Sequence, residues 1–217
     1  MTTPNQIEFV FDEVEEYHAG ITQHAATILK VSSTVSWDLY AVGRSQGNNG
    51  PTFWDQHVDY GNDNPNAINN LPLSLLELRQ NQANNGDGAA TGAFSDYSQA
   101  FSNAKTPSAG NSLYVNGGLA TPPSANDKYI AGHKGTSGTA GQDFMTGGSY
   151  LTQTGVTSDY YFVMDYRILP GLPAIFPNAA NADGTAFEDI VTANAAGNYA
   201  EPGVYTMYVQ YVLLEDQ

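Results

Sequence analysis

The last strand-like run of the chain places the strongest constraint on its fold. Over residues 204–214 every odd position is apolar or aromatic, while the even positions are mixed, and a Pro-Gly pair precedes the run. The odd positions are Tyr205, Met207, Val209, Tyr211 and Leu213. Alternation with a period of two, in residues rich in β-branched and aromatic types, predicts a long strand with one buried face. Such a strand needs a neighbouring strand and a covered sheet.

Shorter alternating runs predict that the rest of the fold is all-β as well. The predicted strands are Gln6–Asp12, Ala26–Ser33, Val35–Ala41, Leu113–Val115 and Tyr160–Leu169. Residues 71–79 favour a further strand, with one helical turn as the alternative, because their leucines fit both periods. Long stretches rich in Gly, Asn, Ser and Pro separate these runs. We therefore predict a single Ig-like or pilin-like β-sandwich with long Gly/Asn-rich loops.

Composition excludes several classes of protein. The 22 acidic residues outnumber the 7 basic ones, and the net charge of −15 repels phosphate backbones, so we expect no nucleic-acid partner. No apolar run approaches the roughly 20 residues that span a bilayer, so we expect no membrane insertion. The absence of cysteine excludes disulfides and thiol catalysis. Only 13% of residues are charged, about half the usual share, and Asn, Gln, Ser, Thr, Gly and Tyr supply the missing polarity. A surface of such neutral hydrogen-bonding groups is common in exported β-proteins and coats.

Sequence signatures of enzymes are missing. The chain has no Gly-rich phosphate loop, no Gly-x-Ser-x-Gly motif and no His-Glu-x-x-His motif. Its four histidines, His18, His24, His57 and His133, are dispersed along the sequence. We therefore predict that the chain is not an enzyme.

The densest polar and aromatic cluster covers residues 54–60. Trp54 and Tyr60 are suited to stack on a sugar ring, and Asp55, His57 and Asp59 alternate, so that in an extended segment they share one face. That face could bind a metal ion or sugar hydroxyls. The alternative is a strand at a loop edge whose aromatic rings pack on the core.

Three loops contain the oxygen-rich side chains that bind calcium. The candidate ligands are Asp59, Asp63, Asp87 and Asp183. The spacing does not match an EF-hand, and the Asn-Gly and Asp-Gly pairs in these loops also form turns without a metal. We expect no obligatory cofactor, with bound calcium as the alternative. The negative charge either attracts such cations or serves solubility alone.

Two segments carry a resemblance to a known group of proteins. The ending Pro-Gly-Val-Tyr-Thr-Met-Tyr-Val-Gln-Tyr-Val-Leu resembles the closing strand of secreted bacterial pilin and fimbrial-adhesin sandwiches. Residues 28–39 resemble the Val-x-Ser…Trp-x-Leu hairpin of exported Ig-like surface domains. The resemblance covers less than a fifth of the chain, and the familiar pilin disulfide is absent. It implies subunits that each lack a strand and receive one from a neighbour.

The N-terminus has the form of such a donated strand. We divide the chain into residues 1–16, a strand with an acidic linker, and residues 17–217, the sandwich. Ile7, Phe9 and Phe11 share one face. The acidic run Asp12–Glu16 is either a solvated turn or a charged, extended linker. The segment either enters a neighbouring copy, with the odd face of the closing strand as acceptor, or forms the first strand of its own sandwich.

The function predicted from these features is structural. We expect a subunit of an extracellular filament or surface layer that polymerises head to tail with other copies by strand complementation, its signal segment already removed. One alternative is a carbohydrate-binding surface adhesin that uses Trp54, His57 and Tyr60 on glycans. Another alternative is a viral capsid or tail protein.

Overall fold

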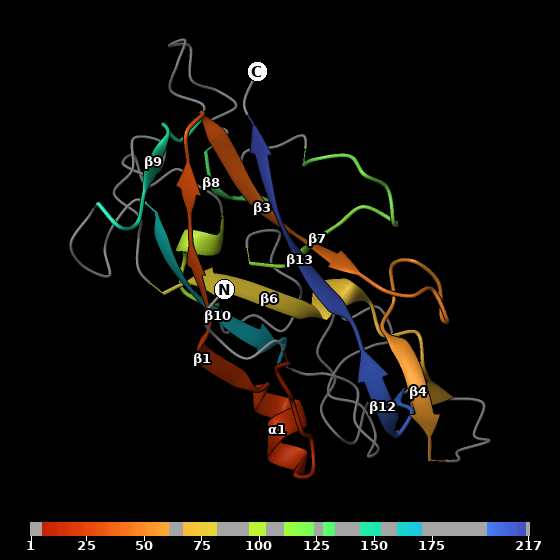
Figure 1. The fold of residues 1–217 in the computed structure, drawn as a ribbon. Helices are drawn as coiled ribbons and strands as arrows, with labels where there is room; N and C mark the ends of the chain where they lie inside the picture. The colour runs from red at the N-terminus through yellow and green to blue at the C-terminus, as the bar shows by residue number, and fades with distance from the viewer. Residues whose placement is uncertain are drawn as a thin grey trace.

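The computed structural model describes residues 6–60, 67–81, 96–102, 111–123, 128–132, 144–152, 160–170 and 199–215 (Figure 1). These residues are mostly strands and loops, which confirms the all-β class. The elements are α1 (Val14–Ala19), β1 (Thr22–Lys30), β2 (Ser32–Ser33), β3 (Trp37–Arg44), β4 (Asp55–Asp59), β5 (Ala67–Ile68), η1 (Leu73–Leu75), β6 (Leu76–Gln80), η2 (Asp96–Ser98), β7 (Tyr114–Val115), β8 (Tyr129–Ala131), β9 (Gly148–Ser149), β10 (Tyr161–Ile168), β11 (Tyr199–Ala200), β12 (Gly203–Thr206) and β13 (Tyr208–Glu215). None of the described helices has the length and apolarity needed to cross a membrane.

Two principal sheets face each other across one core. The first has the strand order β1-β10-β6, and the second has the order β13-β3-β7, with β8 also paired to β3. Side chains from both sheets are fully or almost fully buried between them, among them Trp37, Leu78, Phe162 and Met164. The alternation that predicted β3, β6 and β10 thus places one face of each strand in a shared core, and the fold is sandwich-like.

Backbone hydrogen bonds close one side of this sandwich. In residues 111–115 the chain crosses from the first sheet to the second. The amide of Leu78 donates to the carbonyl of Asn111 (2.8 Å), and the amide of Leu113 donates to the carbonyl of Leu76 (2.9 Å). The next two residues form β7 and pair in parallel with β3. Main-chain hydrogen bonds therefore connect the two sheets along this side.

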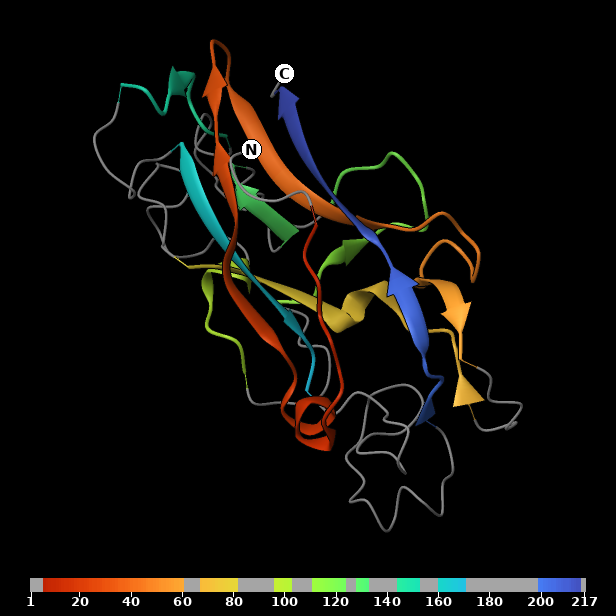
Figure 2. The same ribbon diagram turned by 60° about the horizontal axis from the view of Figure 1, so that its bottom comes forward.

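The opposite side lies between the edge strands β1 and β13, and the N-terminal segment, residues 6–12, runs along it (Figure 2). The predicted strand Gln6–Asp12 is wrong in one respect. The segment alternates between partly buried and exposed side chains, as a strand does, but it belongs to no β-ladder. Within the described residues its amides and carbonyls make no backbone–backbone hydrogen bond.

The acidic run Asp12–Glu16 is exposed at Asp12, Glu13 and Glu15, as in the solvated alternative, but its conformation is neither a turn nor an extended linker. It begins helix α1, with Glu13 as the N-cap residue. The carboxylate of Glu16 accepts hydrogen bonds from the amides of Asp12 (2.9 Å) and Glu13 (3.1 Å). Acidic side chains are favourable in the first turn because the helix dipole is positive there. The predicted boundary after residue 16 consequently falls inside a helix.

The C-terminal run, predicted as one strand, is two. It is interrupted at Met207, so that β12 pairs with β4 in a separate two-stranded sheet and β13 pairs with β3. For residues 71–79 the sequence left a strand and a single helical turn as alternatives, and both are present, because the helical turn η1 leads directly into β6.

Candidate functional site

The open side of the sandwich contains a cleft of about 910 Å³. The N-terminal segment, both principal sheets and the β4–β12 pair contribute to its walls. Its lining includes Phe9 and Phe11 from the segment, Tyr166 from β10, Tyr211 from β13 and Trp54 from the turn before β4. The cleft is therefore the place where the two chain ends, identified separately in the sequence, come together.

The side chains of the N-terminal segment divide as the alternation predicts. Ile7, Phe9 and Phe11 are partly buried and pack against the main core, and the Phe11 ring lies 4.9 Å from that of Tyr17, centroid to centroid. Val10, on the other face, is 61% exposed. The apolar face of the segment thus covers the cleft from the open side.

Side chains near the start of β1 supply the polar attachment of the segment. The side-chain amide of Gln23 donates to the carbonyl of Glu8 (3.3 Å), and the hydroxyl of Tyr17 donates to the carbonyl of Phe11 (3.1 Å). Both donors belong to the α1–β1 part of the chain. Among the described residues, the segment is consequently held by a few side-chain contacts, and most of its own main-chain groups have no partner there.

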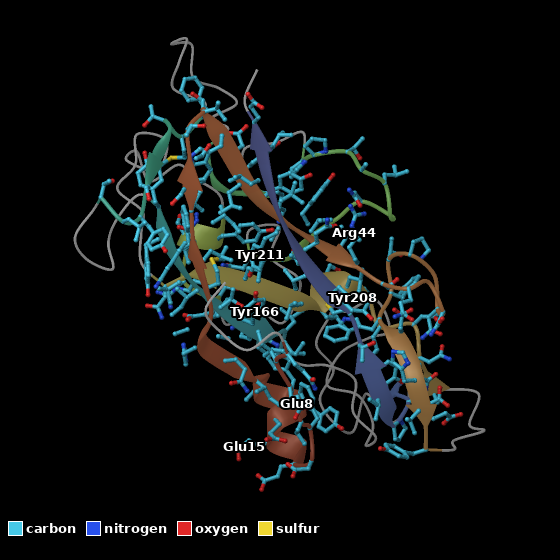
Figure 3. The ribbon with its side chains drawn as sticks, in the orientation of Figure 1. Glu8, Glu15, Arg44, Tyr166, Tyr208 and Tyr211 are labelled. Carbon is cyan, nitrogen blue, oxygen red and sulfur yellow. The ribbon has the colours of Figure 1, made fainter. Side chains whose placement is uncertain are left out.

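A hydroxyl network spans the floor of the cleft. Tyr166 and Tyr211, both labelled in Figure 3, are hydrogen bonded to each other. The hydroxyl of Thr27 lies 3.0 Å from that of Tyr166. The three residues come from β10, β13 and β1, so the network links the two sheets. Burial raises the pKa of Tyr211 well above its usual value and also raises the pKa of Tyr166. Both phenols therefore stay protonated and serve as neutral hydrogen-bonding groups.

The predicted acceptor face is only partly covered. Tyr205, Met207, Val209 and Tyr211 line the cleft and are partly buried. Leu213, the last of the five predicted positions, is 48% exposed. The expectation that the whole odd face is buried is wrong at this position, and the apolar stripe of β13 continues past the cleft.

The predicted sugar-binding trio, Trp54, His57 and Tyr60, lies on the same cleft. The indole N–H of Trp54 donates to the carbonyl of Pro72 (3.2 Å), and the ring packs on the core. The Nε2 atom of His57 lies 2.6 Å from the hydroxyl of Thr206, and Tyr60 is 67% exposed. Trp54 is thus a core-packing residue as well as a wall of the cleft.

Asp55 does not share a ligand face with His57 and Asp59. It is fully buried, and its carboxylate accepts hydrogen bonds from the backbone amides of Gln46 and Asn48, the latter at 2.8 Å. The carboxylate of Asp55 therefore stabilises the loop after β3 through these hydrogen bonds. His57 and Asp59 are exposed.

The calcium prediction is only partly covered by the structure. Asp59 ends β4, whereas Asp63, Asp87 and Asp183 lie outside the described residues. In the part of the chain that the structure describes, no group of three or more His, Asp or Glu side chains is placed to hold a metal ion. Calcium binding stays a prediction.

The buried charges of β6 and β10 were not predicted from the sequence, and they do not belong to the lining of the cleft. Asp165 in β10 is fully buried and accepts hydrogen bonds from the amide of Ala25 (2.7 Å) and from the side chain of Asn81 (2.9 Å). Glu77 and Arg167, also buried, form an ion pair between β6 and β10. The only signal was a charged residue inside an otherwise apolar strand, and such a residue is buried only with partners.

No protein-family model matches this sequence, and no curated protein is significantly similar to it. A functional proposal therefore depends on the geometry of the cleft and on the sequence patterns described above.

Proposed function

We propose that this chain is a structural subunit of an extracellular filament or surface layer, in which the N-terminal segment of one copy enters the cleft of the next. The proposal depends on how residues 6–12 are attached to the rest of the domain. Their apolar face packs on the core, yet within the described residues their main chain has no backbone partner. A segment attached in this way is able to leave its own cleft and be replaced by the same segment of another copy.

The energetics favour exchange into a ladder. Apolar contacts are non-directional, so Ile7, Phe9 and Phe11 bury the same surface in any identical cleft. Each backbone hydrogen bond gained on pairing adds about 0.5–1.5 kcal/mol, and in the described part of the structure most main-chain groups of the segment have no partner. A contact between the segment of one copy and the cleft of another is heterologous, and it builds a filament unless the rotation closes a ring.

The surface of the chain is consistent with a role outside the cell. Charged residues are scarce, and neutral hydrogen-bonding side chains replace them. The resemblance of the C-terminal run to secreted pilin sandwiches supports the same location. With a net charge of −15, copies repel one another, so assembly should be favoured by salt, which screens that repulsion.

Negative-stain microscopy and sedimentation of the purified chain test the proposal. The protein is concentrated at low and at high salt, with and without a brief exposure to urea that releases the segment. We expect polymers, in greater amount at high salt. A chain lacking residues 1–13 is the matched control, and we expect it to remain folded by circular dichroism and monomeric. If the full-length chain stays monomeric under all these conditions, the proposal fails.

One observation favours a second candidate, a carbohydrate-binding surface module. Trp54, His57 and Tyr60 line one cleft, as a sugar site requires. The test is a glycan array with the intact chain and with Tyr60→Ala, since Tyr60 is exposed and its removal does not disturb the core. Binding that is lost in the variant supports this candidate. An array without hits, or with hits that Tyr60→Ala leaves unchanged, rules it out.

A further inference from the structure

The described residues contain two Asn-Gly pairs, Asn49-Gly50 and Asn116-Gly117. In such a pair the amide nitrogen of the glycine is able to attack the side-chain carbonyl of the asparagine, because glycine has no side chain to obstruct the approach. We propose that Asn116 is a site of spontaneous covalent modification, at which Arg44 promotes conversion of the side-chain amide to a carboxylate, and that Asn49 is protected from the same reaction. This inference does not depend on the proposed function.

Asn116 begins a tight turn that leaves the attacking group free. The amide of Leu119 donates to the carbonyl of Asn116 (3.2 Å), and Gly117 and Gly118 have φ angles of 63° and 86°, as in a type I′ turn. Both glycines are exposed, and nothing lies within 4 Å of the position that a Cβ atom of Gly117 would take. Within the described residues the amide of Gly117 makes no hydrogen bond, and the side-chain NH2 group of Asn116 has one acceptor, the carbonyl of Thr121 (3.0 Å). The Gly117 amide is therefore able to turn toward the Asn116 side chain.

A guanidinium group contacts the carbonyl that would be attacked. Arg44, labelled in Figure 3, ends β3, and its Nη1 atom donates to the side-chain oxygen of Asn116 (2.6 Å) and to the carbonyl of Leu119 (2.8 Å). Its Nε atom donates to the side-chain oxygen of Gln210 (3.2 Å), which holds the group from β13. A charged donor on a carbonyl oxygen draws electrons from the carbon and stabilises the oxyanion that forms when a nucleophile adds. Arg44 thus activates the carbon that Gly117 attacks.

The reaction consumes water and releases ammonia. The amide nitrogen of Gly117 bonds to Cγ of Asn116, and the electron pair of the carbonyl moves to the oxygen that Arg44 contacts. When this intermediate collapses, the bond from Cγ to Nδ2 breaks, and the proton of the Gly117 amide leaves with that nitrogen as ammonia. Water then opens the cyclic imide at either of its carbonyls, which gives aspartate or its β-linked isomer at position 116. The new carboxylate lies beside the Arg44 guanidinium and forms an ion pair with it.

Asn49 lacks these features. Its side-chain NH2 group donates to the carbonyls of Trp54 (3.1 Å) and Asn69 (3.0 Å), so the leaving group is held by two acceptors. The amide of Gly50 donates to the carbonyl of Gly47 (3.1 Å), so the attacking nitrogen is already hydrogen bonded. In the described part of the structure no cation contacts the side-chain oxygen of Asn49. The same dipeptide is therefore placed in a reactive setting at one position and in a protected setting at the other.

Peptide mass mapping measures the reaction at each site. The purified chain is incubated at mildly alkaline pH and digested with trypsin, and conversion is read from the small gain in mass when OH replaces NH2. Asn49, Asn116 and the remaining Asn-Gly pair of the sequence, Asn85-Gly86, fall in three different tryptic peptides. A sample unfolded in guanidinium chloride shows the reactivity of the sequence alone. We expect conversion in the folded chain to be about tenfold faster at Asn116 than at Asn49, and the two rates to become similar in the unfolded chain.

Variants of the contact to Arg44 test the cause. Arg44→Ala should slow conversion at Asn116 about tenfold and leave Asn49 unchanged. Gln210→Ala keeps the contact between Arg44 and Asn116 and is the matched control, with little change expected. Unfolding of a variant would appear as faster conversion at Asn49. Equal rates at Asn49 and Asn116 in the folded chain, or a rate at Asn116 that Arg44→Ala leaves unchanged or increases, would overturn the inference. Neither result bears on the proposed function, because residues 44 and 116 are not part of the cleft lining.

Discussion

The two sides of the sandwich are closed in different ways. On one side, residues 111–115 hydrogen bond through their main chain to β6 and then to β3. On the other side, residues 6–12 cover the cleft with three apolar side chains and without a backbone ladder in the described structure. Main-chain closure fixes register and belongs to the fold, whereas closure by apolar side chains is non-directional and can be exchanged.

This difference explains why a chain with a complete core can still act as an assembly unit. Main-chain hydrogen bonds of residues 111–115 hold the two sheets together on their side, so we expect the domain to stay folded when the N-terminal segment leaves the cleft. The segment can then serve another copy.

The largest expected effect separates the two faces of the segment. Phe9→Asp puts a charge into the cleft and should reduce polymer formation about tenfold or more, because an unpaired buried charge is strongly unfavourable. Val10→Asp adds the same charge on the exposed face of the neighbouring residue and is the matched control. Sedimentation of the two variants at equal concentration and high salt measures the effect. Equal loss in both variants would mean that the face of the segment does not matter.

A second prediction compares how much a buried side chain on each side of the sandwich contributes to the free energy of unfolding. Leu113 is almost fully buried on the side closed by residues 111–115, and Leu113→Ala should lower the free energy of unfolding by about 3 kcal/mol. Phe9 is only partly buried, and Phe9→Ala should cost about 1 kcal/mol in the monomer. Urea unfolding of both variants, kept monomeric at low salt, gives the two values. A larger loss for Phe9→Ala would show that the segment is an integral part of the fold.

High pH should loosen the floor of the cleft. Burial raises the pKa of Tyr211 above the usual value of 10.0, so above this pH the unfolded chain has released its proton while the folded chain still holds it. The free energy of unfolding therefore falls as the pH rises above 10, by about 1.4 kcal/mol per pH unit for one such group. Tyr211→Phe should remove that share of the slope. Urea unfolding over this pH range measures it, and an unchanged slope would contradict the buried network.

The smallest expected effect concerns the start of α1. Hydrogen bonds from the amides of Glu13 and Asp12 lower the pKa of Glu16 below its usual value of 4.5. Its contribution is present above that value and is lost as the pH falls through the lowered pKa. Glu16→Ala should speed hydrogen exchange at the amides of residues 12 and 13. Glu16→Gln, which can still accept hydrogen bonds, should keep most of the protection but lose its dependence on pH, as measured by NMR.

Alternation in the sequence was sufficient to predict the long strands of the two principal sheets, whereas the short paired strands β5, β8, β9 and β11 were not predicted. The runs at residues 26–33, 35–41 and 160–169 correspond to β1, β3 and β10, because in a covered sheet the side-chain pattern and the ladder go together. The same pattern at residues 6–12 predicted the buried face correctly but not the missing ladder. Whether an alternating segment is paired depends on the edge beside it. The neighbouring edge strand β1 has a bulge between Gln23 and Thr27, and the local sequence did not predict it.

The candidate site was predictable only in its aromatic parts. Trp54, His57 and Tyr60 are near each other in sequence, and the fold keeps them on one cleft. Asp55 could not be placed correctly, because its role comes from the amides of a loop several residues away. The contact between Tyr166 and Tyr211 joins two strands from different sheets, and this pairing depends on the topology rather than on spacing in the chain.

Hydrogen–deuterium exchange at the amides of residues 6–11 reports whether the main chain of the segment is paired. The amide of Asp12 is left out because it donates to the carboxylate of Glu16 within the monomer. We predict fast exchange at residues 6–11 in the monomer, slow exchange there in the polymer, and slow exchange at residues 111–115 in both. Slow exchange at residues 6–11 in the monomer, or fast exchange in the polymer, would contradict the exchange of this segment between copies.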